Sequence, residues 1–373
     1  MGGGRRGIRA LKILTEMNIR VEFWLDNDSS KIGTVIENLK CVDRDEICLS
    51  DYYIFVSPLN SNELYNNLKE KYERVIPTEG LKYLEILSRM FSGKEPYGYI
   101  KIHSLGHFYE PYPDLNWVIK YEKDRKCSWR DIKDINYNIE EQKNFLLSME
   151  KCYNTAPKWQ GKDKITSYRY YYENDQFEIV DALFLHCMMR ILKPKRIIEV
   201  GSGYSSAVML DTNQYYFNNE IKLSFIEPYP QRLKQLLQEN DNIELYECIL
   251  QDVDIKYFDK LEKGDILFID SSHVSKRDSD VNKIFFEIFP RLKSGVYIHI
   301  HDVMKDFEYP INWLMNGNVW NEMYLLRAFL QNNNDYKIVF FEGLMLELYY
   351  DEIRKRWPYE HFVPGGSFWM KKI

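Results

Sequence analysis

The second half of the chain alternates short apolar runs with stretches of helical period. Residues 196–200, 222–228 and 265–270 have the apolar pattern of strands, and a helical pattern over 177–192 stops before Pro194. Strands that alternate with helices predict an α/β fold with a doubly wound, mostly parallel sheet. Ligands of such sheets bind outside the carboxyl ends of the strands, so the residues after each strand are the first candidates for a site.

The same alternation continues to the C-terminus. It predicts further strands over 243–250 and 295–303, helices over 230–240 and 279–292, and a glycine turn that feeds a last strand within 361–373.

The chain divides into three predicted parts: a small Rossmann-like α/β domain over 1–90, a linker and helical segment over 91–160, and the main domain over 161–373. The small domain lacks its first strand, because the glycines of GGGRRG stand at the start of the chain, which points to a truncated or misassigned start. A structural or docking role is favoured there, because a glycine loop without its strand is a weak nucleotide-binding signal.

Within the small domain, the pattern predicts strands over 21–25, 52–58 and 73–77 and a helix over 59–72.

Composition and charge limit the classes of partner. The 373 residues are 45% hydrophobic, enough for packed cores, and carry a net charge of −6, which argues against nucleic acid as a partner. No run approaches the length of a membrane span, and the first ten residues lack the apolar stretch of a secretory signal. The six cysteines include no CxxC pair, which is typical of reduced thiols in a cytoplasmic protein. Self-association into a homo-oligomer stays open.

The first strand of the main domain runs into an acidic, glycine-containing turn, IIEVGSGYSS (197–206). Gly201 and Gly203 permit a sharp turn and the close approach of a ligand. Glu199 can orient this loop or receive the ammonium group of a ligand. Serines stand where a pyrophosphate loop would carry its third glycine, which favours a less charged cofactor.

Acids and an amide follow the next two strands. Glu227 can accept two hydrogen bonds from ribose hydroxyls, and Gln251 with Asp252 can bond the amino edge of an adenine. In order and spacing, these motifs resemble those of class I S-adenosylmethionine-dependent methyltransferases, over about 165–373. The resemblance implies S-adenosyl-L-methionine as the cofactor, bound by Glu199, Gly201, Ser202, Gly203, Tyr204, Ser205, Ser206, Glu227, Gln251, Asp252 and Asp270. It also suggests that Tyr170, Tyr171 and Asn174 cover the methionine end.

Carboxylates and histidines follow the fourth and fifth strands. DILFIDSSHV (265–274) supplies Asp270 and His273, and HIHDV (299–303) supplies His301 and Asp302. Two carboxylates and an imidazole at one rim suit a divalent metal ion. Period two places His299 on the same strand face as His301, and we expect His299 to be a core residue.

This rim is similar in layout to that of catechol-type, metal-dependent O-methyltransferases. The similarity implies Mg²⁺ or Mn²⁺ at Asp270, His301 and Asp302, with His301 in place of an acid. The base lysine of that family stands three residues after the first acid, where this chain has His273. An imidazole with an unperturbed pKa of about 6.5 can take a proton directly, whereas a metal would acidify the hydroxyl by coordination. Both routes stay open.

A segment rich in aromatic and polar residues follows the fifth strand. Some of them share one helical face and could stack on a sugar ring. The predicted substrate residues are Glu308, Tyr309, Trp320, Asn321, Tyr324 and Arg327.

The sequence therefore predicts an enzyme that methylates an oxygen of a saccharide or related small molecule, with His273 and Asp270 as catalytic residues. FIEPYP, SDVN, FEYP and WNEMYLLRAFL further resemble a bacterial subgroup of uncharacterised methyltransferases that is associated with surface glycans. Two alternatives stay open: an NAD(P)-dependent oxidoreductase or sugar-nucleotide-modifying enzyme that uses GGGRRG as its dinucleotide loop, and a non-catalytic cofactor-binding scaffold subunit.

Overall fold

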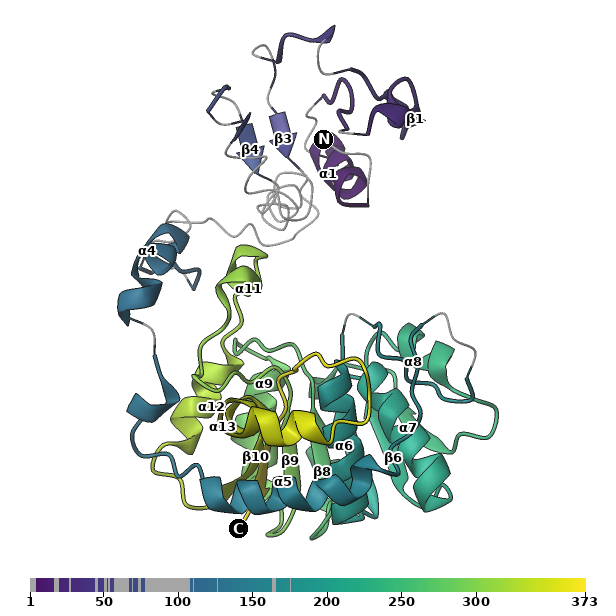
Figure 1. The fold of residues 1–373 in the computed structure, drawn as a ribbon, viewed down its shortest axis with the longest axis vertical. Helices are drawn as coiled ribbons and strands as arrows, with labels where there is room; N and C mark the ends of the chain where they lie inside the picture. The colour runs from purple at the N-terminus through teal and green to yellow at the C-terminus, as the bar shows by residue number, and fades with distance from the viewer. Residues whose placement is uncertain are drawn as a thin grey trace. The chain divides into compact units, whose positions relative to one another are not determined.

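The structure is a computed structural model, shown in Figure 1. The residues that it describes are 5–16, 20–26, 28–43, 46–49, 52, 54–56, 67–68, 70–72, 75–77, 108–109, 111–125, 127–162, 166–174 and 176–373. Contacts group the chain into two compact units, residues 1–122 with 310–319, and residues 123–309 with 320–373. No helix among the described residues is long and apolar enough to cross a membrane.

The second unit is built on a seven-stranded sheet in the order β10-β11-β9-β8-β5-β6-β7. Its strands are β5 (Arg196–Val200), β6 (Lys222–Ile226), β7 (Ile243–Tyr246), β8 (Ile266–Ile269), β9 (Tyr297–Ile300), β10 (Tyr336–Phe341) and β11 (Phe368–Lys372). All neighbours from β7 to β9 pair in parallel, and β11 runs antiparallel to both β9 and β10. The predicted α/β fold with a mostly parallel, doubly wound sheet is confirmed.

Helices of the second unit cover the sheet. They are α5 (Ile139–Tyr153), α6 (Ile179–Leu192), α7 (Tyr204–Phe217), α8 (Gln231–Leu236), α9 (Asp280–Lys283), a π-helical turn (Ile284–Ile288), α10 (Phe289–Arg291), α12 (Glu322–Leu330) and α13 (Glu342–Lys355). Short 3₁₀ turns lie at Trp129–Asp131, Leu250–Asp252 and Ile255–Lys260. α5 contacts α6, and α6 contacts α7, while α5 and α13 pass in front of the sheet in Figure 1.

α5 belongs to the second unit because a buried amide ties it to the sheet. The Gln142 side chain donates to the Tyr137 carbonyl and accepts a 2.7 Å hydrogen bond from the backbone N–H of Phe341, at the end of β10. The predicted three-part division at residues 90 and 160 stays a prediction, but this packing argues against a boundary at 160.

The helices of the first unit are α1 (Arg5–Glu16) and α11 (Ile311–Met315), with a 3₁₀ turn at Ser29–Lys31. Its strands form an antiparallel pair, β1 (Val35–Ile36) with β2 (Leu39–Lys40), and a parallel pair, β3 (Ile54–Val56) with β4 (Val75–Pro77). α4 (Leu115–Arg125) includes residues of both units. Two of the strands predicted for the first unit are thus confirmed. The strand predicted over 21–25 was wrong, because only Trp24 forms a bridge there, with Cys41. The glycines of GGGRRG and most of the helix predicted over 59–72 lie outside the described residues.

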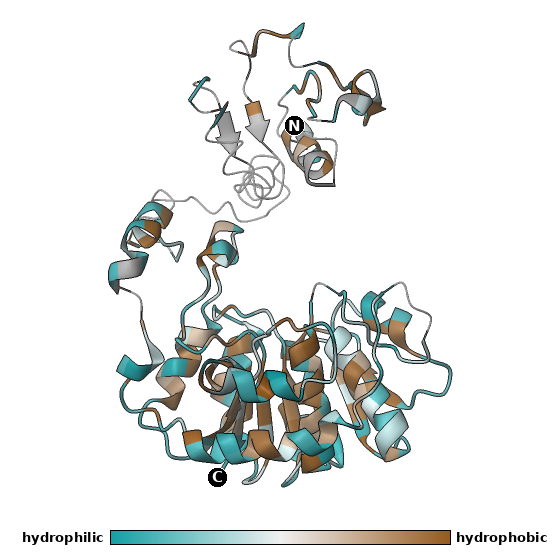
Figure 2. Cartoon of the chain, in the orientation of Figure 1, coloured by the Kyte–Doolittle hydropathy of each residue, from teal (hydrophilic) through white to brown (hydrophobic). Residues whose placement is uncertain are grey.

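The core of the second unit explains why its strands read as unbroken apolar runs. All four residues of β8 are buried, and helices with apolar faces pack on the sheet. In Figure 2 the central strands are brown, while the outer surfaces of the helices are largely teal. Phe268, in the middle of β8, packs its ring on those of Phe177, His299 and Trp369.

The order of the strands reverses between β5 and β8. The chain moves outward from β5 to β6 and β7, and then crosses back to place β8 on the other side of β5. In an open α/β sheet such a reversal separates the connecting loops and leaves a crevice at the carboxyl ends of the two strands. The candidate residues should therefore gather at the ends of β5 and β8.

We predict that Asp265→Ala destabilises the second unit, because this buried carboxylate joins the starts of β5 and β8. It accepts backbone hydrogen bonds from Lys195, Arg196 and Glu262 at 3.0, 2.9 and 2.9 Å. The variant leaves three backbone N–H groups without an acceptor, which should lower the free energy of unfolding by about 2–4 kcal/mol. Urea denaturation measures this loss.

The control for this prediction is Asp254→Ala, which removes an exposed helix cap with one hydrogen bond, from the backbone N–H of Lys256. It should cost about 1 kcal/mol or less. Equal losses in the two variants would contradict the prediction.

Candidate active site

Strand register brings the candidate residues to one edge of the sheet. The last paired residues of β5, β6, β8 and β9 lie side by side: Val200 opposite Ile226 and Ile269, and Ile269 opposite Ile300. The next residue of each strand is therefore aligned as well, and these are Gly201, Glu227, Asp270 and His301. Backbone hydrogen bonds continue across this row, from Gly201 to Ile226, from Asp270 to Val200, and from His301 to Ile269.

Glu199 fixes the loop 201–206 that follows β5, which is called the glycine loop below. This fully buried carboxylate accepts hydrogen bonds from the hydroxyls of Ser205 and Ser206, both at 2.5 Å, one on each oxygen. Ser206 also accepts from the backbone N–H of Gly203 at 3.0 Å. Burial raises the pKa of Glu199 to about 8, although both serines act against this. Glu199 was predicted either to orient the loop or to receive the ammonium group of a ligand. Its hydrogen bonds to Ser205 and Ser206 support the first role.

Gly201 is required by a contact with the neighbouring strand end. Its φ is +81°, and a Cβ there would stand 1.7 Å from the carbonyl oxygen of Asp270. The two strand ends at the topological reversal therefore touch through a residue that must lack a side chain. Gly203 differs, because its φ is extended and a Cβ would be 3.5 Å from the nearest atom of Arg232.

The predicted ribose acid lies next to this loop. Glu227 is half-buried and accepts hydrogen bonds from the backbone N–H groups of Ser202 at 3.0 Å and Tyr229 at 2.8 Å. Each oxygen thus keeps capacity for a further donor. The two residues predicted to contact the adenine, Gln251 and Asp252, differ in their surroundings. Gln251 donates to the carbonyl of Asp278 at 2.7 Å, whereas Asp252 is exposed.

His273 lies among three carboxylates. Its Nε2 is 3.4 Å from Asp270 Oδ1 and 3.6 Å from Asp302 Oδ2, and its Nδ1 is 2.8 Å from Glu322 Oε2. The side chains of His273 and Glu322 are buried, while those of Asp270 and Asp302 keep 30% and 21% of their surface exposed. The imidazole is therefore held from inside and reaches solvent on the carboxylate side.

These charges determine the protonation of the rim. Burial by itself would lower the pKa of His273, but hydrogen bonds to Asp270 and Glu322 outweigh it and raise that pKa well above its usual value. Burial raises the pKa of Asp302. For Asp270, the nearby His301 and His273 overcome the effect of burial and lower the pKa. The carboxylates therefore favour the protonated form of His273, and the two histidines favour the ionised form of Asp270.

Two residues of the rim have left-handed backbones. The φ angles of His273 and Asp302 are +60° and +58°. Such conformations are costly for residues with a side chain and gather at functional sites. Here they turn both side chains from the ends of β8 and β9 toward one another.

The predicted metal site at Asp270, His301 and Asp302 stays a prediction. Within the described part of the chain, no group of three or more His, Cys, Asp or Glu residues is arranged to hold a metal ion. His273 Nε2 lies 3.4 and 3.6 Å from Asp270 and Asp302, so an imidazole already interacts with both carboxylates.

Several of the predicted substrate residues contact one another. Trp320 lies against His273, with ring centroids 4.4 Å apart, and Tyr309 packs behind it at 6.1 Å. Asn321 has a structural role, because its side chain exchanges hydrogen bonds with the backbone of Ser275. The Tyr324 ring packs edge to face on Tyr309 at 5.6 Å, and its hydroxyl donates to Glu308 at 3.2 Å. Arg327 contacts Cys127.

Glu322 is the residue whose pairing with His273 the sequence did not predict. It begins α12, and both its own backbone N–H and that of Asn321 donate to the carbonyl of His273. A buried acid at a helix start was the available signal, but 49 residues separate it from its partner. His299 is a core residue, as expected: it is fully buried, stacks on Phe268 at 3.8 Å, and burial keeps its pKa well below the usual value.

Comparison with known proteins identifies the domain. Residues 198–303, from β5 to the end of the rim, match a family model described as a methyltransferase domain. Residues 198–303 are therefore a methyltransferase domain. An uncharacterised protein of the archaeon Archaeoglobus fulgidus is 32% identical over 167 residues, which is 44% of this methyltransferase and 76% of the archaeal protein.

Two solved structures are also similar to this methyltransferase. The S-adenosylhomocysteine-bound methyltransferase PaMTH1 of Podospora anserina is 14% identical, with 63% of this chain and 93% of that chain covered and a TM-score of 0.34. The O-methyltransferase TomG of Streptomyces achromogenes, in complex with S-adenosylmethionine, is 12% identical, with 69% and 96% covered and a TM-score of 0.35.

We predict that Gly201→Ala disrupts the site while Gly203→Ala does not. The first variant combines a left-handed φ with a clash against the Asp270 carbonyl, and should lower the free energy of unfolding by about 2–4 kcal/mol. The second meets no such contact. Chemical denaturation of both variants checks this, and a stable, parent-like Gly201→Ala would contradict it.

Proposed function

We propose that this methyltransferase transfers a methyl group to an oxygen of a saccharide or related small molecule, with the cofactor on the glycine loop and the acceptor at His273. One observation carries the proposal. The loop that follows β5 touches the end of β8 at Asp270, and Asp270 lies 3.4 Å from His273. A donor site and a proton acceptor thus meet at the topological reversal, where ligands of such sheets bind.

The residues at the glycine loop fit S-adenosyl-L-methionine. The hydroxyls of Ser202 and Ser271 are buried and lack a hydrogen-bond partner among the described residues, on the two sides of the reversal. Glu227 keeps acceptor capacity for a ribose, and the exposed Asp252 lies further along the same edge. When bound, this cofactor supplies a methyl group made electrophilic by its sulfonium.

His273 is the proposed base. Glu322 bonds Nδ1 and so fixes the ring with Nε2 toward Asp270 and Asp302. The charged rim that raises its pKa also makes the neutral imidazole a stronger base, and alkaline pH favours that form. Orientation of the acceptor oxygen would supply much of the remaining rate, up to about 7–11 kcal/mol in model reactions.

Support for a saccharide comes from the aromatic wall beside the base. Trp320 and Tyr309 lie edge to face at an interplanar angle of 80°, and Trp320 tilts over His273. Such rings offer apolar surface next to polar groups, which suits the face of a sugar or another planar acceptor.

We predict that His273→Asn lowers turnover about 10²–10⁴-fold, because it removes the base. Its affinity for S-adenosylhomocysteine should stay within about threefold of the parent, because the ion-pair partners of His273 are Asp270, Asp302 and Glu322, outside the glycine loop. Turnover is measured with radiolabelled S-adenosylmethionine and the best acceptor from a panel of saccharides and hydroxylated small molecules.

The matched control is Arg277→Ala, an exposed residue of the same loop, which should leave turnover and affinity unchanged. Full turnover by His273→Asn would remove the base from the proposal.

We predict that turnover is insensitive to EDTA and to added Mg²⁺ or Mn²⁺, because no group of the described residues is arranged to hold a metal ion. The same radiolabel assay measures this, after dialysis against the chelator. Loss of activity that Mg²⁺ restores would favour the metal route at Asp270 and Asp302 instead.

A further inference from the structure

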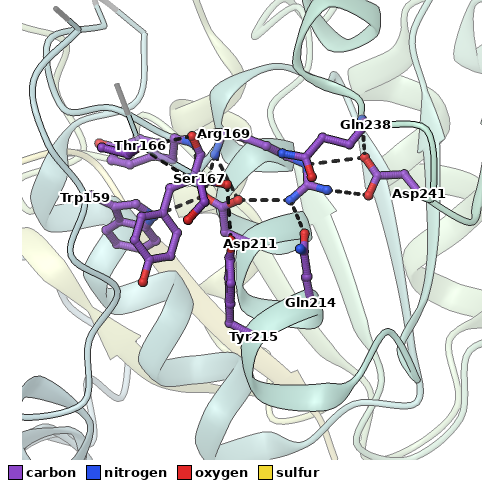
Figure 3. Close-up of polar contacts among 11 residues, drawn as sticks. Trp159, Thr166, Ser167, Arg169, Asp211, Gln214, Tyr215, Gln238 and Asp241 are labelled. Carbon is purple, nitrogen blue, oxygen red and sulfur yellow. Dashed lines mark hydrogen bonds and ion pairs between the residues drawn. The ribbon is translucent and has the colours of Figure 1, made fainter. Parts of the chain in front are cut away.

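A buried arginine lies on the cofactor side, outside the residues assigned to the site. Arg169 belongs to the segment 166–174, which leads into α6 and is called the lead-in segment below. Its side chain is 2% exposed and pairs with two carboxylates: Asp211 at 3.1 Å and Asp241 at 2.5 Å (Figure 3). It also donates to Gln214 at 2.7 Å.

The cluster joins three separate pieces of the chain. Asp211 and Gln214 belong to α7, the helix that the glycine loop opens. Asp241 follows α8 and also accepts from the backbone N–H of Gln238 at 2.7 Å (Figure 3). Burying a cation is expensive unless each of its donors is satisfied, and an arginine fork meets that demand with several carboxylate and amide partners.

Asp211 fixes the backbone of the lead-in segment as well as the guanidinium. It is fully buried and accepts from the backbone N–H groups of Arg169 and Tyr170 at 3.0 and 3.1 Å. It also accepts from the indole N–H of Trp159 at 3.1 Å (Figure 3). The position of the next residue in the chain, Tyr171, is set by these contacts.

Tyr171 connects the Arg169 cluster to the glycine loop. Its hydroxyl hydrogen-bonds to that of Tyr204, the first residue of α7, and the two rings meet edge to face at 5.1 Å. The Arg232 guanidinium lies 5.6 Å from the centre of the Tyr204 ring, and its side chain borders Gly203. Asn174 donates to the carbonyl of Tyr171 at 2.7 Å and so closes the turn behind it.

We propose that Arg169 is a positioning residue for the cofactor site, which holds Tyr171 against Tyr204 beside the glycine loop. This inference rests on the proposed function, because it takes the glycine loop as the binding site of the S-adenosyl group. It assigns to the lead-in segment the role of a fixed wall on the cofactor side. The wall depends on a charge cluster that itself need not touch the cofactor.

The test is a double-mutant cycle on the full chain, with S-adenosylhomocysteine as the titrated ligand. Arg169→Met and Tyr171→Phe should each weaken affinity about tenfold. If Arg169 acts through Tyr171, the double variant should also be about tenfold weaker, and not a hundredfold. A purely structural role would instead give independent, multiplying effects.

Stability separates positioning from general damage. Arg169→Met should also lower the melting temperature, whereas Tyr171→Phe, which loses one hydroxyl, should not. The control is Glu347→Gln, which weakens ion pairs to Arg130 and Lys305 elsewhere in the unit. It should lower the melting temperature without changing the affinity. If Arg169→Met does not fold, Arg169→Lys takes its place in the cycle, because lysine keeps the charge but not the fork.

Parent-like affinity in Tyr171→Phe, or multiplying effects in the cycle, would overturn the positioning role. Failure of the parent itself to bind S-adenosylhomocysteine would count against the proposed function.

Discussion

The contact between the ends of β5 and β8 is the constraint on which the site depends. A Cβ at Gly201 would lie 1.7 Å from the Asp270 carbonyl, so the glycine loop and the rim are held at a fixed spacing. The parallel register aligns Glu227 and His301 on either side of that contact. Residues that are 26 to 69 positions apart in the chain become neighbours because four strands end at the same level.

Electrostatics at the rim follow from the same geometry. Two strand ends and the start of α12 bring three carboxylates around His273, and the imidazole balances part of their charge. The left-handed backbones of His273 and Asp302 show that the arrangement is maintained at a local conformational cost.

Much of the main domain could be read from the sequence because its strands are fully buried. Apolar runs such as β8, followed by Asp270, carry a signal that needs no tertiary information. β10 and α13 were missed, because β10 alternates buried and half-buried residues and α13 follows it with no intervening turn signal.

The candidate site was predictable only where its residues directly follow strands. Glu199, Gly201 and Glu227 lie at the glycine loop as expected. The pairing of His273 with Glu322 and of Arg169 with Asp241 is set by packing across 49 and 72 residues, which no local pattern encodes. The sequence likewise shows the residue types at the rim, but not that His273 lies close to both carboxylates.

The most direct test of the central claim is hydrogen–deuterium exchange of the full chain with and without S-adenosylhomocysteine. The account predicts slower exchange in the peptides that cover 199–206, 226–229 and 270–273, because these strand ends form the cofactor site. Slower exchange confined to the first unit, or none at saturating ligand, would contradict it.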